Sequence, residues 1–141
     1  MKPAKLILIT LAGLAVAACA PRDTTHYLSI NDALNSADGK KVLNPNIKLY
    51  FAQNAPGKVL AQGLVSNKKT NATLKSDEAA CRWAFLSALK QFQERAASMG
   101  ATKVSNIVSF YKKNPYRSES QYECHAGRMI GGVALKGDIV K

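Results

Sequence analysis

One long amphipathic segment, residues 76–100, constrains the fold more than any other feature of the chain. Apolar residues recur in it at spacings of three and four, which is the period of one helix face. These residues are Cys81, Phe85, Ala88, Leu89, Phe92, Ala96 and Met99. Ser76 can cap the start of such a helix, and Asp77 and Glu78 suit its positive first turn. Gly100 can end it in a left-handed conformation, so the segment predicts one long helix that buries this face.

The segments on either side of this helix have the composition of β-strands. They are rich in β-branched and aromatic residues and are separated by turn signals; the five runs are 47–52, 59–66, 103–111, 121–125 and 133–140. Gly63 and Gly137 predict bulges or kinks within two of them. We predict α/β content in an α+β arrangement: an antiparallel four-stranded sheet, in the order β-β-α-β-β, with the long helix packed on one face. Residues 67–75, before the helix, are polar and predict a loop.

The first 18 residues have the layout of an export signal. Lys2 and Lys5 precede an apolar run, Leu6–Val16, and small residues follow it up to Ala18. The run is shorter than the roughly 20 residues that a membrane-spanning helix needs. The pattern therefore predicts export of the chain, with residues 1–18 removed.

The end of this signal, Val16-Ala17-Ala18-Cys19, resembles the lipobox of bacterial lipoproteins. The resemblance implies that the Cys19 thiol is diacylated, that the chain is cut before this residue and that the new amine is acylated. Acyl chains contribute about 0.8 kcal/mol per buried CH₂, so several chains together anchor firmly. Because Ala20 and not Asp follows the cysteine, the resemblance implies the outer membrane, facing the periplasm. The alternative is an ordinary export signal with a chance cysteine beside its cleavage site.

Three parts are expected along the chain. Residues 20–27 are polar and predict a short tether, and residues 30–34 predict one or two helical turns capped by Ser29 or Asn31. Asp38-Gly39 is a turn signal. The expected parts are a lipoprotein signal peptide at 1–18, a lipidated tether with a short helical turn at 19–43, and a single α+β periplasmic domain at 44–141.

Two cysteines remain once Cys19 is assigned to lipidation. In an exported domain, Cys81 and Cys124 are expected to be paired and not free. The bond would close a loop of about 43 residues and would stabilise the fold by a few kcal/mol in the chain-entropy model. Two roles stay open, a permanent structural staple and a redox-sensitive switch.

The chain carries a strong excess of positive charge. Its formal net charge is +11, and the loss of Lys2 and Lys5 with the signal leaves +9. In a cytosolic protein this charge would suggest nucleic-acid binding, but an exported protein meets lipopolysaccharide phosphates, lipid head groups and acidic outer-membrane proteins. A merely solubilising surface is the alternative. The candidate contacts to an anionic partner are Lys68, Lys69, Lys112, Lys113 and Arg117.

Trp83 lies beside the apolar stripe of the predicted helix. It either widens the buried face or forms an exposed apolar contact. An exposed Trp83 would suit a second role, that of a structural or assembly accessory of the outer membrane that binds an envelope protein. Such an apolar contact is insensitive to salt, whereas a contact made by lysines weakens as ions screen it.

No pattern in the sequence indicates catalysis, a cofactor or a metal centre. His26 and His125 are the only histidines, and His125 cannot easily share an ion with Cys124, because adjacent strand residues point to opposite faces. No serine lies in a Gly-x-Ser-x-Gly turn. Gly39-Lys40 and Gly57-Lys58 lack the earlier glycine and the following Ser or Thr of a nucleotide-binding loop. We therefore predict a non-enzymatic protein that binds neither nucleotide nor nucleic acid.

Four segments in the second half of the chain carry a family likeness; they are Asp77–Cys81, Met99–Val104, Tyr122–Cys124 and Gly132–Leu135. Together they resemble the periplasmic domain of the Rcs stress-sensing outer-membrane lipoprotein, over about residues 77–137. The resemblance implies a sensing role and a disulfide between Cys81 and Cys124. The chain departs from that family in lacking cysteines for a second disulfide and in having a short tether, where the family has a long, proline-rich, basic one.

A second likeness runs through the chain after Cys19. Asn67–Asn71, Cys81–Ala88 and Tyr111–Asn114 resemble a group of small exported bacterial proteins of unknown role, often labelled as an excinuclease ATPase subunit. That label implies nucleotide binding, for which the chain has no loop. The periplasm also holds neither ATP nor genomic DNA in quantity, so the label finds no support in the sequence.

Overall fold

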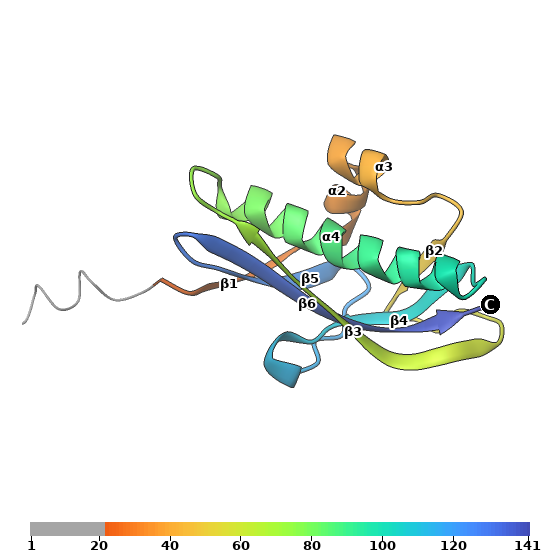
Figure 1. Cartoon of the computed structure of the whole chain (residues 1–141). Helices are drawn as coiled ribbons and strands as arrows, with labels where there is room; N and C mark the ends of the chain where they lie inside the picture. Colours follow the sequence, from red (N-terminus) through yellow and green to blue (C-terminus); the bar gives the residue numbers. More distant parts are fainter. Residues whose placement is uncertain (1–21) are drawn as a thin grey trace, which may run out of the picture.

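The computed structural model describes residues 22–141 and has a mixed α+β fold, in which one long helix crosses a face of a six-stranded sheet (Figure 1). The predicted signal peptide and Cys19 lie outside the described residues. In chain order the elements are β1 (Thr24–Ser29), α2 (Ile30–Asn35), α3 (Ala37–Val42), β2 (Lys48–Phe51), β3 (Val59–Asn71), α4 (Asp77–Ser98), β4 (Lys103–Ser109), the 3-10 turn η1 (Tyr111–Lys113), β5 (Gln121–Ala126) and β6 (Ile130–Val140). Among the helices described, none is long and apolar enough to cross a membrane.

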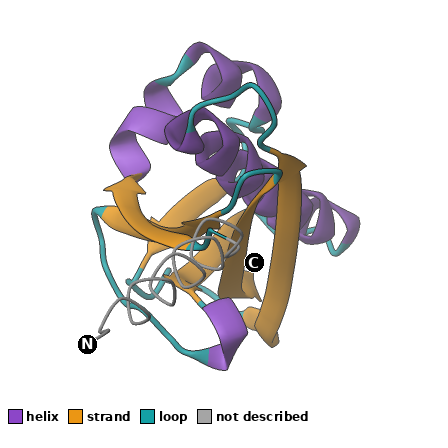
Figure 2. Cartoon of the chain, turned by 90° about the vertical axis from the view of Figure 1, so that its left-hand side faces the viewer, coloured by secondary structure: helices purple, strands orange, loops and turns teal. Residues whose placement is uncertain are grey.

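Strand β6 is the centre of the sheet. Along one edge it pairs antiparallel with β3, from Asn71 opposite Ile130 to Val59 opposite Val140. Its other edge is shared between β5 near its start and β4 further along. Strand β1 extends the sheet beyond β5, and β2 extends it beyond β4. Because two different strands share one edge of β6, the sheet curls around the space that α4 fills (Figure 2).

Helix α4 confirms the helix predicted from the apolar stripe. The Ser76 side chain accepts a hydrogen bond from the Ala79 backbone N–H, and Gly100 adopts a φ of 68° just after the helix. The buried face is wider than the stripe, because Leu86 is fully buried as well. The helix lies very close to β6 at Gly131, where an added Cβ would lie 3.1 Å from the side chain of Ala80. That close approach explains why glycine stands at this point of the central strand.

The predicted disulfide between Cys81 and Cys124 is present and joins α4 to β5. The two cysteines are fully buried. Beside them, the ring of Phe85 from α4 stacks on the ring of Tyr122 from β5, with centroids 3.9 Å apart. The bond therefore lies inside the apolar core and connects the helix to the sheet. Burial in this core raises the pKa of the Tyr122 phenol.

The sheet differs from the predicted one in strand number and in direction. The count of four was wrong, because all five segments marked as extended are strands and Thr24–Ser29 adds a sixth. The sheet is also not purely antiparallel, since β2 runs parallel to β4, with Leu49 opposite Val104. Strand β3 continues to Asn71, through residues that were expected to form a loop. The bulge predicted at Gly63 is confirmed by a register shift between Ala61 and Leu64 and by a φ of 66° at the glycine.

The region before residue 44 also differs from the prediction. The residues expected as a tether include Thr24–Tyr27, which belong to β1 and pair with β5. The helical turn expected at 30–34 is confirmed as α2, with Ser29 as its cap. The turn expected at Asp38-Gly39 is instead part of α3. Because these elements join the sheet or pack against α4, the folded unit begins about twenty residues earlier than predicted.

Candidate functional site

A groove on the sheet face away from α4 brings together lysines that are distant in the sequence. It has a volume of about 480 Å³. Lys68 and Lys69 border it from β3, Lys112 borders it from η1, and its floor is the β6 segment from Gly132 to Ala134. Three of the five cationic candidates predicted from charge alone therefore surround one hollow.

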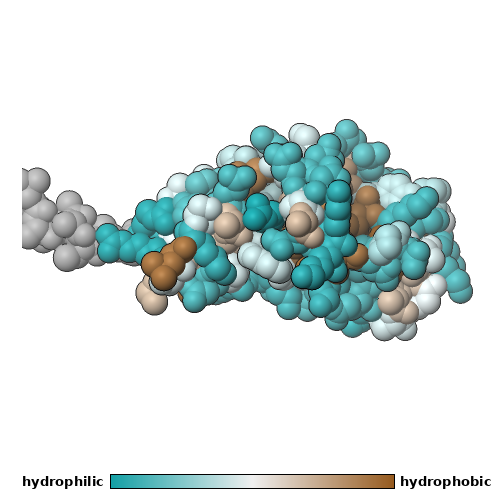
Figure 3. All heavy atoms as spheres, turned by 90° about the horizontal axis from the view of Figure 1, so that it is seen from above, coloured by the Kyte–Doolittle hydropathy of each residue, from teal (hydrophilic) through white to brown (hydrophobic). Residues whose placement is uncertain are grey.

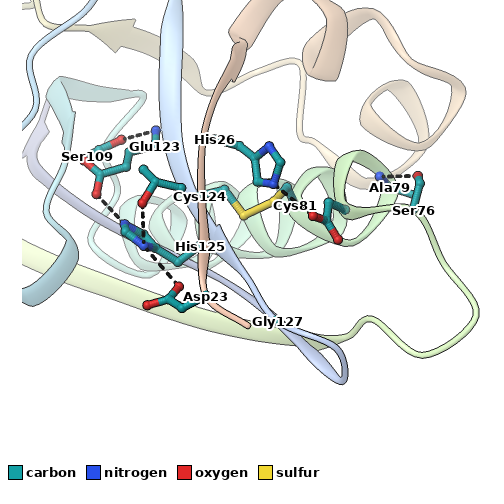
Figure 4. The surroundings of a disulfide bond; sticks show 12 residues. Asp23, His26, Ser76, Ala79, Cys81, Ser109, Glu123, Cys124, His125 and Gly127 are labelled. Carbon is teal, nitrogen blue, oxygen red and sulfur yellow. Dashed lines mark hydrogen bonds and ion pairs between the residues drawn. A yellow bond between two sulfur atoms is a disulfide. The ribbon is translucent and has the colours of Figure 1, made fainter. Parts of the chain in front are cut away.

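The register of the sheet places Lys69 on the groove face. Residues directly opposite each other in antiparallel strands project to the same side. Lys69 is opposite Gly132, and Gly132 is opposite His125 on its other edge. Figure 4 shows Cys124 turned toward α4 and His125 turned away from it. Lys69 and His125 therefore face the groove side, and Gly132, which has no side chain, leaves the floor open between them.

Alternation along β3 gives the two neighbouring lysines different roles. Ser66, two residues before Lys68, donates its hydroxyl to the Ala88 carbonyl of α4. Because side chains alternate along a strand, the side chain of Lys68 leaves the strand on the α4 side of the sheet. Lys68 therefore borders the groove only at the edge of β3. Lys69 and Lys112 are therefore the two cations that face the groove directly.

The other wall of the groove is η1, which folds back under the sheet (Figure 1). The Phe110 N–H donates to the Ala134 carbonyl at 2.8 Å, which fixes the start of η1 to the groove floor. The ring of Tyr111 then stacks on the ring of His125, with centroids 3.5 Å apart. Lys112 adopts a φ of 52°, and its ammonium lies 5.6 Å from the centre of the Tyr111 ring. The wall therefore offers an aromatic face with a cation beside it.

His125 is held in place by oxygen atoms on both sides of its ring (Figure 4). Its Nε2 hydrogen-bonds the carboxylate of Glu123, and its Nδ1 lies 3.3 Å from the Thr25 hydroxyl and 3.6 Å from the Asp23 carboxylate. The ring thus forms a fixed support beneath Tyr111. Within residues 22–141, no three His, Cys, Asp or Glu side chains are arranged to hold a metal ion.

The remaining predicted contacts lie away from the groove. Lys113 is exposed next to Lys112 but does not line the hollow. Arg117 is held by local bonds, since its guanidinium donates to the Asn106 side-chain oxygen at 2.9 Å and to the Ala52 carbonyl at 3.3 Å. Trp83 lies on α4, on the other side of the sheet, with 36% of its surface exposed.

Tyr111, Glu123 and His125 were not predicted as parts of the site. Glu123 and His125 are two residues apart in a predicted strand, and this spacing alone indicated that they share a face. Their contact with Tyr111 joins β5 to the turn after β4. Nothing in the local sequence of Tyr111 indicated that its ring would cover this pair.

A second polar cluster fixes the start of the described chain. The Arg22 guanidinium donates to both carboxylate oxygens of Asp77, at 2.7 and 2.9 Å, and to the Gly127 carbonyl at 2.9 Å. His26 hydrogen-bonds the same carboxylate at 2.9 Å. The hydrogen bonds from Arg22 lower the pKa of Asp77 to about 2. The chain therefore enters the domain beside the first turn of α4 and the turn between β5 and β6.

Comparison with protein-family models, with curated proteins and with solved structures gave no match.

Proposed function

We propose that the protein is a non-catalytic lipoprotein of the cell envelope, anchored by acyl chains on Cys19, that binds or senses an anionic partner through its groove. The observation that carries the proposal is the convergence of Lys69 from β3 and Lys112 from η1 on one hollow. These residues are far apart in the sequence, so their meeting depends on the fold. The lipobox-like end of the signal supports the location, because it places the domain among anionic envelope components.

The chemistry of the groove suits a partner with an anionic group on an apolar or sugar body. Ala134 on the floor offers a small apolar surface, and the Tyr111 ring offers an aromatic face. Two ammonium groups at the rim can meet a phosphate or a carboxylate as charge-assisted hydrogen bonds. An outer-membrane location, facing the periplasm, and a sensing role follow from the resemblances to lipoproteins and remain predictions.

The test is a charge reversal with a matched control. Lys69→Glu with Lys112→Glu reverses the two cations that face the groove, and Lys41→Glu with Lys113→Glu makes the same change of charge on two exposed lysines that do not line it. We expect photo-crosslinked partner capture in cells to be lost in the first variant and to persist in the second. Capture should also weaken as salt is raised in a binding assay with the purified partner. Equal capture by both variants would contradict the proposal.

A second candidate function rests on Trp83. Its indole stays about one-third exposed on α4, on the far side of the sheet from the groove. In the part of the chain that the structure describes, it is the only large apolar side chain of α4 that is exposed. If the protein is an assembly accessory that binds an envelope protein through this residue, Trp83→Ala should abolish photo-crosslinked capture of that protein. Binding of that protein should not respond to salt.

A further inference from the structure

We propose that the domain docks on the anionic lipid bilayer itself. The docking surface is the end of the domain where β1 begins. We call this end the tip and define it as the loops 72–76 and 127–130. This inference goes beyond the groove, because it assigns a different surface to a different partner. Its argument from chain length rests on the proposed lipidation of Cys19, whereas the apolar surface described below stands without it.

The tip exposes three large apolar side chains. Leu74 is fully exposed, Met129 is 70% exposed and Ile130 is 53% exposed. Leu74 also adopts a φ of 62°, a left-handed conformation that a γ-branched residue rarely takes. The chain therefore holds a leucine in an unfavourable backbone conformation, although its side chain gains no contact within the fold. Figure 3 shows hydrophobic atoms on the surface at this end of the molecule.

One hydrogen bond joins the two loops of the tip and a second closes the loop 127–130, so these side chains are presented together. The Ala72 N–H donates to the Met129 carbonyl at 2.8 Å, and the Gly127 N–H donates to the Ile130 carbonyl at 2.8 Å. The loops lie side by side at the same end as the start of β1 (Figure 1). A hollow of about 390 Å³ between them is lined by Met129, Ile130 and the end of β3.

Cations surround this apolar surface. Lys75 and Arg128 are exposed within the two loops, and Lys69 borders the hollow. Of the nearby acids, Asp77 is paired with Arg22, Asp23 lies near His125, and Glu78 faces solvent on α4. Apolar side chains that enter the interface, with basic side chains level with the phosphates, are the recurring design of peripheral membrane contacts.

The place where the described chain begins indicates that the tip contacts the bilayer and not another partner. Arg22 is fixed to the tip by its bonds to Gly127 and Asp77. Cys19 precedes it by three residues, which span at most about 11 Å when extended. An acylated Cys19 therefore requires the membrane surface to lie within this distance of the tip. The exposed apolar side chains of the tip then face the bilayer in which the acyl chains are anchored, and not bulk water.

The experiment measures the depth of single tryptophans in vesicles. The exported full chain, with its N-terminus as the cell leaves it, is placed in vesicles of phosphatidylethanolamine and phosphatidylglycerol that contain brominated lipids. In a Trp83→Phe background, Leu74→Trp or Ile130→Trp reports the tip. Val65→Trp is the matched control, because Val65 is an exposed apolar residue of β3 outside the tip (47% exposed).

We expect lipid bromines to quench the tip tryptophans several-fold more than the control, and we expect this difference to shrink when phosphatidylglycerol is replaced by phosphatidylcholine. Equal quenching at Val65 and Leu74 would overturn the proposal. A tip tryptophan that is shielded from water but not quenched by lipid would also overturn it, in favour of a protein partner or a second copy of the chain.

The two proposals can fail separately. Circular dichroism of each variant checks that the fold is kept. Lys112 lines the groove but not the hollow of the tip, so quenching that persists in a Lys112→Glu variant while partner capture falls supports the groove and the tip as distinct surfaces. Partner capture that persists without quenching at the tip removes the membrane contact and leaves the groove.

Discussion

At the scale of single residues, Asp77 connects three parts of the molecule through one carboxylate. It lies in the first turn of α4, where the helix dipole favours a negative charge. Arg22 and His26 also hydrogen-bond it from the strand β1 region. The entering chain, the first strand and the long helix therefore depend on the same ionised group.

Replacing this carboxylate should have an effect that depends on pH. We expect Asp77→Asn to lower the free energy of unfolding by about 1 kcal/mol at pH 7, a modest value because Arg22 is partly exposed to solvent. The pKa of Asp77 is about 2 in the fold, below the 3.8 of a free aspartate. The contribution is therefore complete above about pH 4 and is lost as pH falls toward 2. Denaturant unfolding of both proteins across this range measures it.

Glu78→Gln is the control for this change. Glu78 also lies in the first turn of α4 but is exposed. Its replacement should cost less stability than that of Asp77. The difference in the free energy of unfolding between the wild type and Asp77→Asn should shrink toward pH 2. A difference that stayed constant from pH 7 to pH 2 would argue against the Arg22–Asp77 pair as its source.

Two adjacent glycines of β6 provide a second prediction at this scale. An added Cβ at Gly131 would lie 3.1 Å from the Ala80 side chain, whereas at Gly132 the nearest atoms are 3.8 Å away. We expect Gly131→Ala to destabilise the fold by about 1 kcal/mol, because the contact between α4 and β6 must open. Gly132→Ala should leave the melting temperature nearly unchanged and should weaken partner capture, since it fills the groove floor. Similar melting temperatures for the two variants would contradict this reading.

At the scale of elements, the disulfide decides how firmly α4 is held to β5. Replacing both Cys81 and Cys124 by alanine should lower the free energy of unfolding by about 2–4 kcal/mol. Because the two cysteines are fully buried, a structural staple should be reduced only as fast as the whole domain unfolds. The rate of thiol release in reductant, compared with the unfolding rate, measures this. Reduction much faster than unfolding would instead favour the redox-sensitive switch.

The elements also differ in how well local sequence predicts them. Helix α4 was predicted because its cap, its acidic first turn and its apolar stripe all lie within the helix itself. Strand β1 was missed because its partner β5 lies about 100 residues away and its own residues are mostly polar. Helix α3 was missed because Gly39 is a turn signal in sequence. In the fold this glycine allows the backbone to pass the Ala33 carbonyl, which a Cβ would approach at 2.3 Å.

In the groove too, local sequence predicted some residues of the site, and the tertiary fold determined the others. Charge alone indicated Lys69 and Lys112, but it also indicated Arg117, whose guanidinium is used to hold a bulge in β4 near Asn106. The stack of Tyr111 on His125 depends on β4 and β5 being placed by β6. A composition-based search could therefore find the cations but not the aromatic wall between them.

At the scale of the whole molecule, the described chain enters the fold through an edge strand. Among the described strands, β1 pairs only with β5, and Arg22 fixes its start to the tip. We expect Arg22→Ala to raise hydrogen exchange at the amides of β1 several-fold and to leave those of β6 unchanged, because opening of an edge strand costs less than global unfolding. Exchange measured by mass spectrometry tests this. Uniform acceleration in both strands would show that β1 and the core open as one unit.

The central place of β6 has a consequence for the proposed export of the chain across a membrane. Strands β3, β4 and β5 each take this strand as a neighbour, and it follows all the other described strands in chain order. Before residues 130–140 emerge, the earlier strands have no common partner, and the sheet cannot close. If the chain is exported as proposed, it would thus stay incompletely folded while it passes through a translocation pore. It would lock into shape only after its final segment had arrived on the far side.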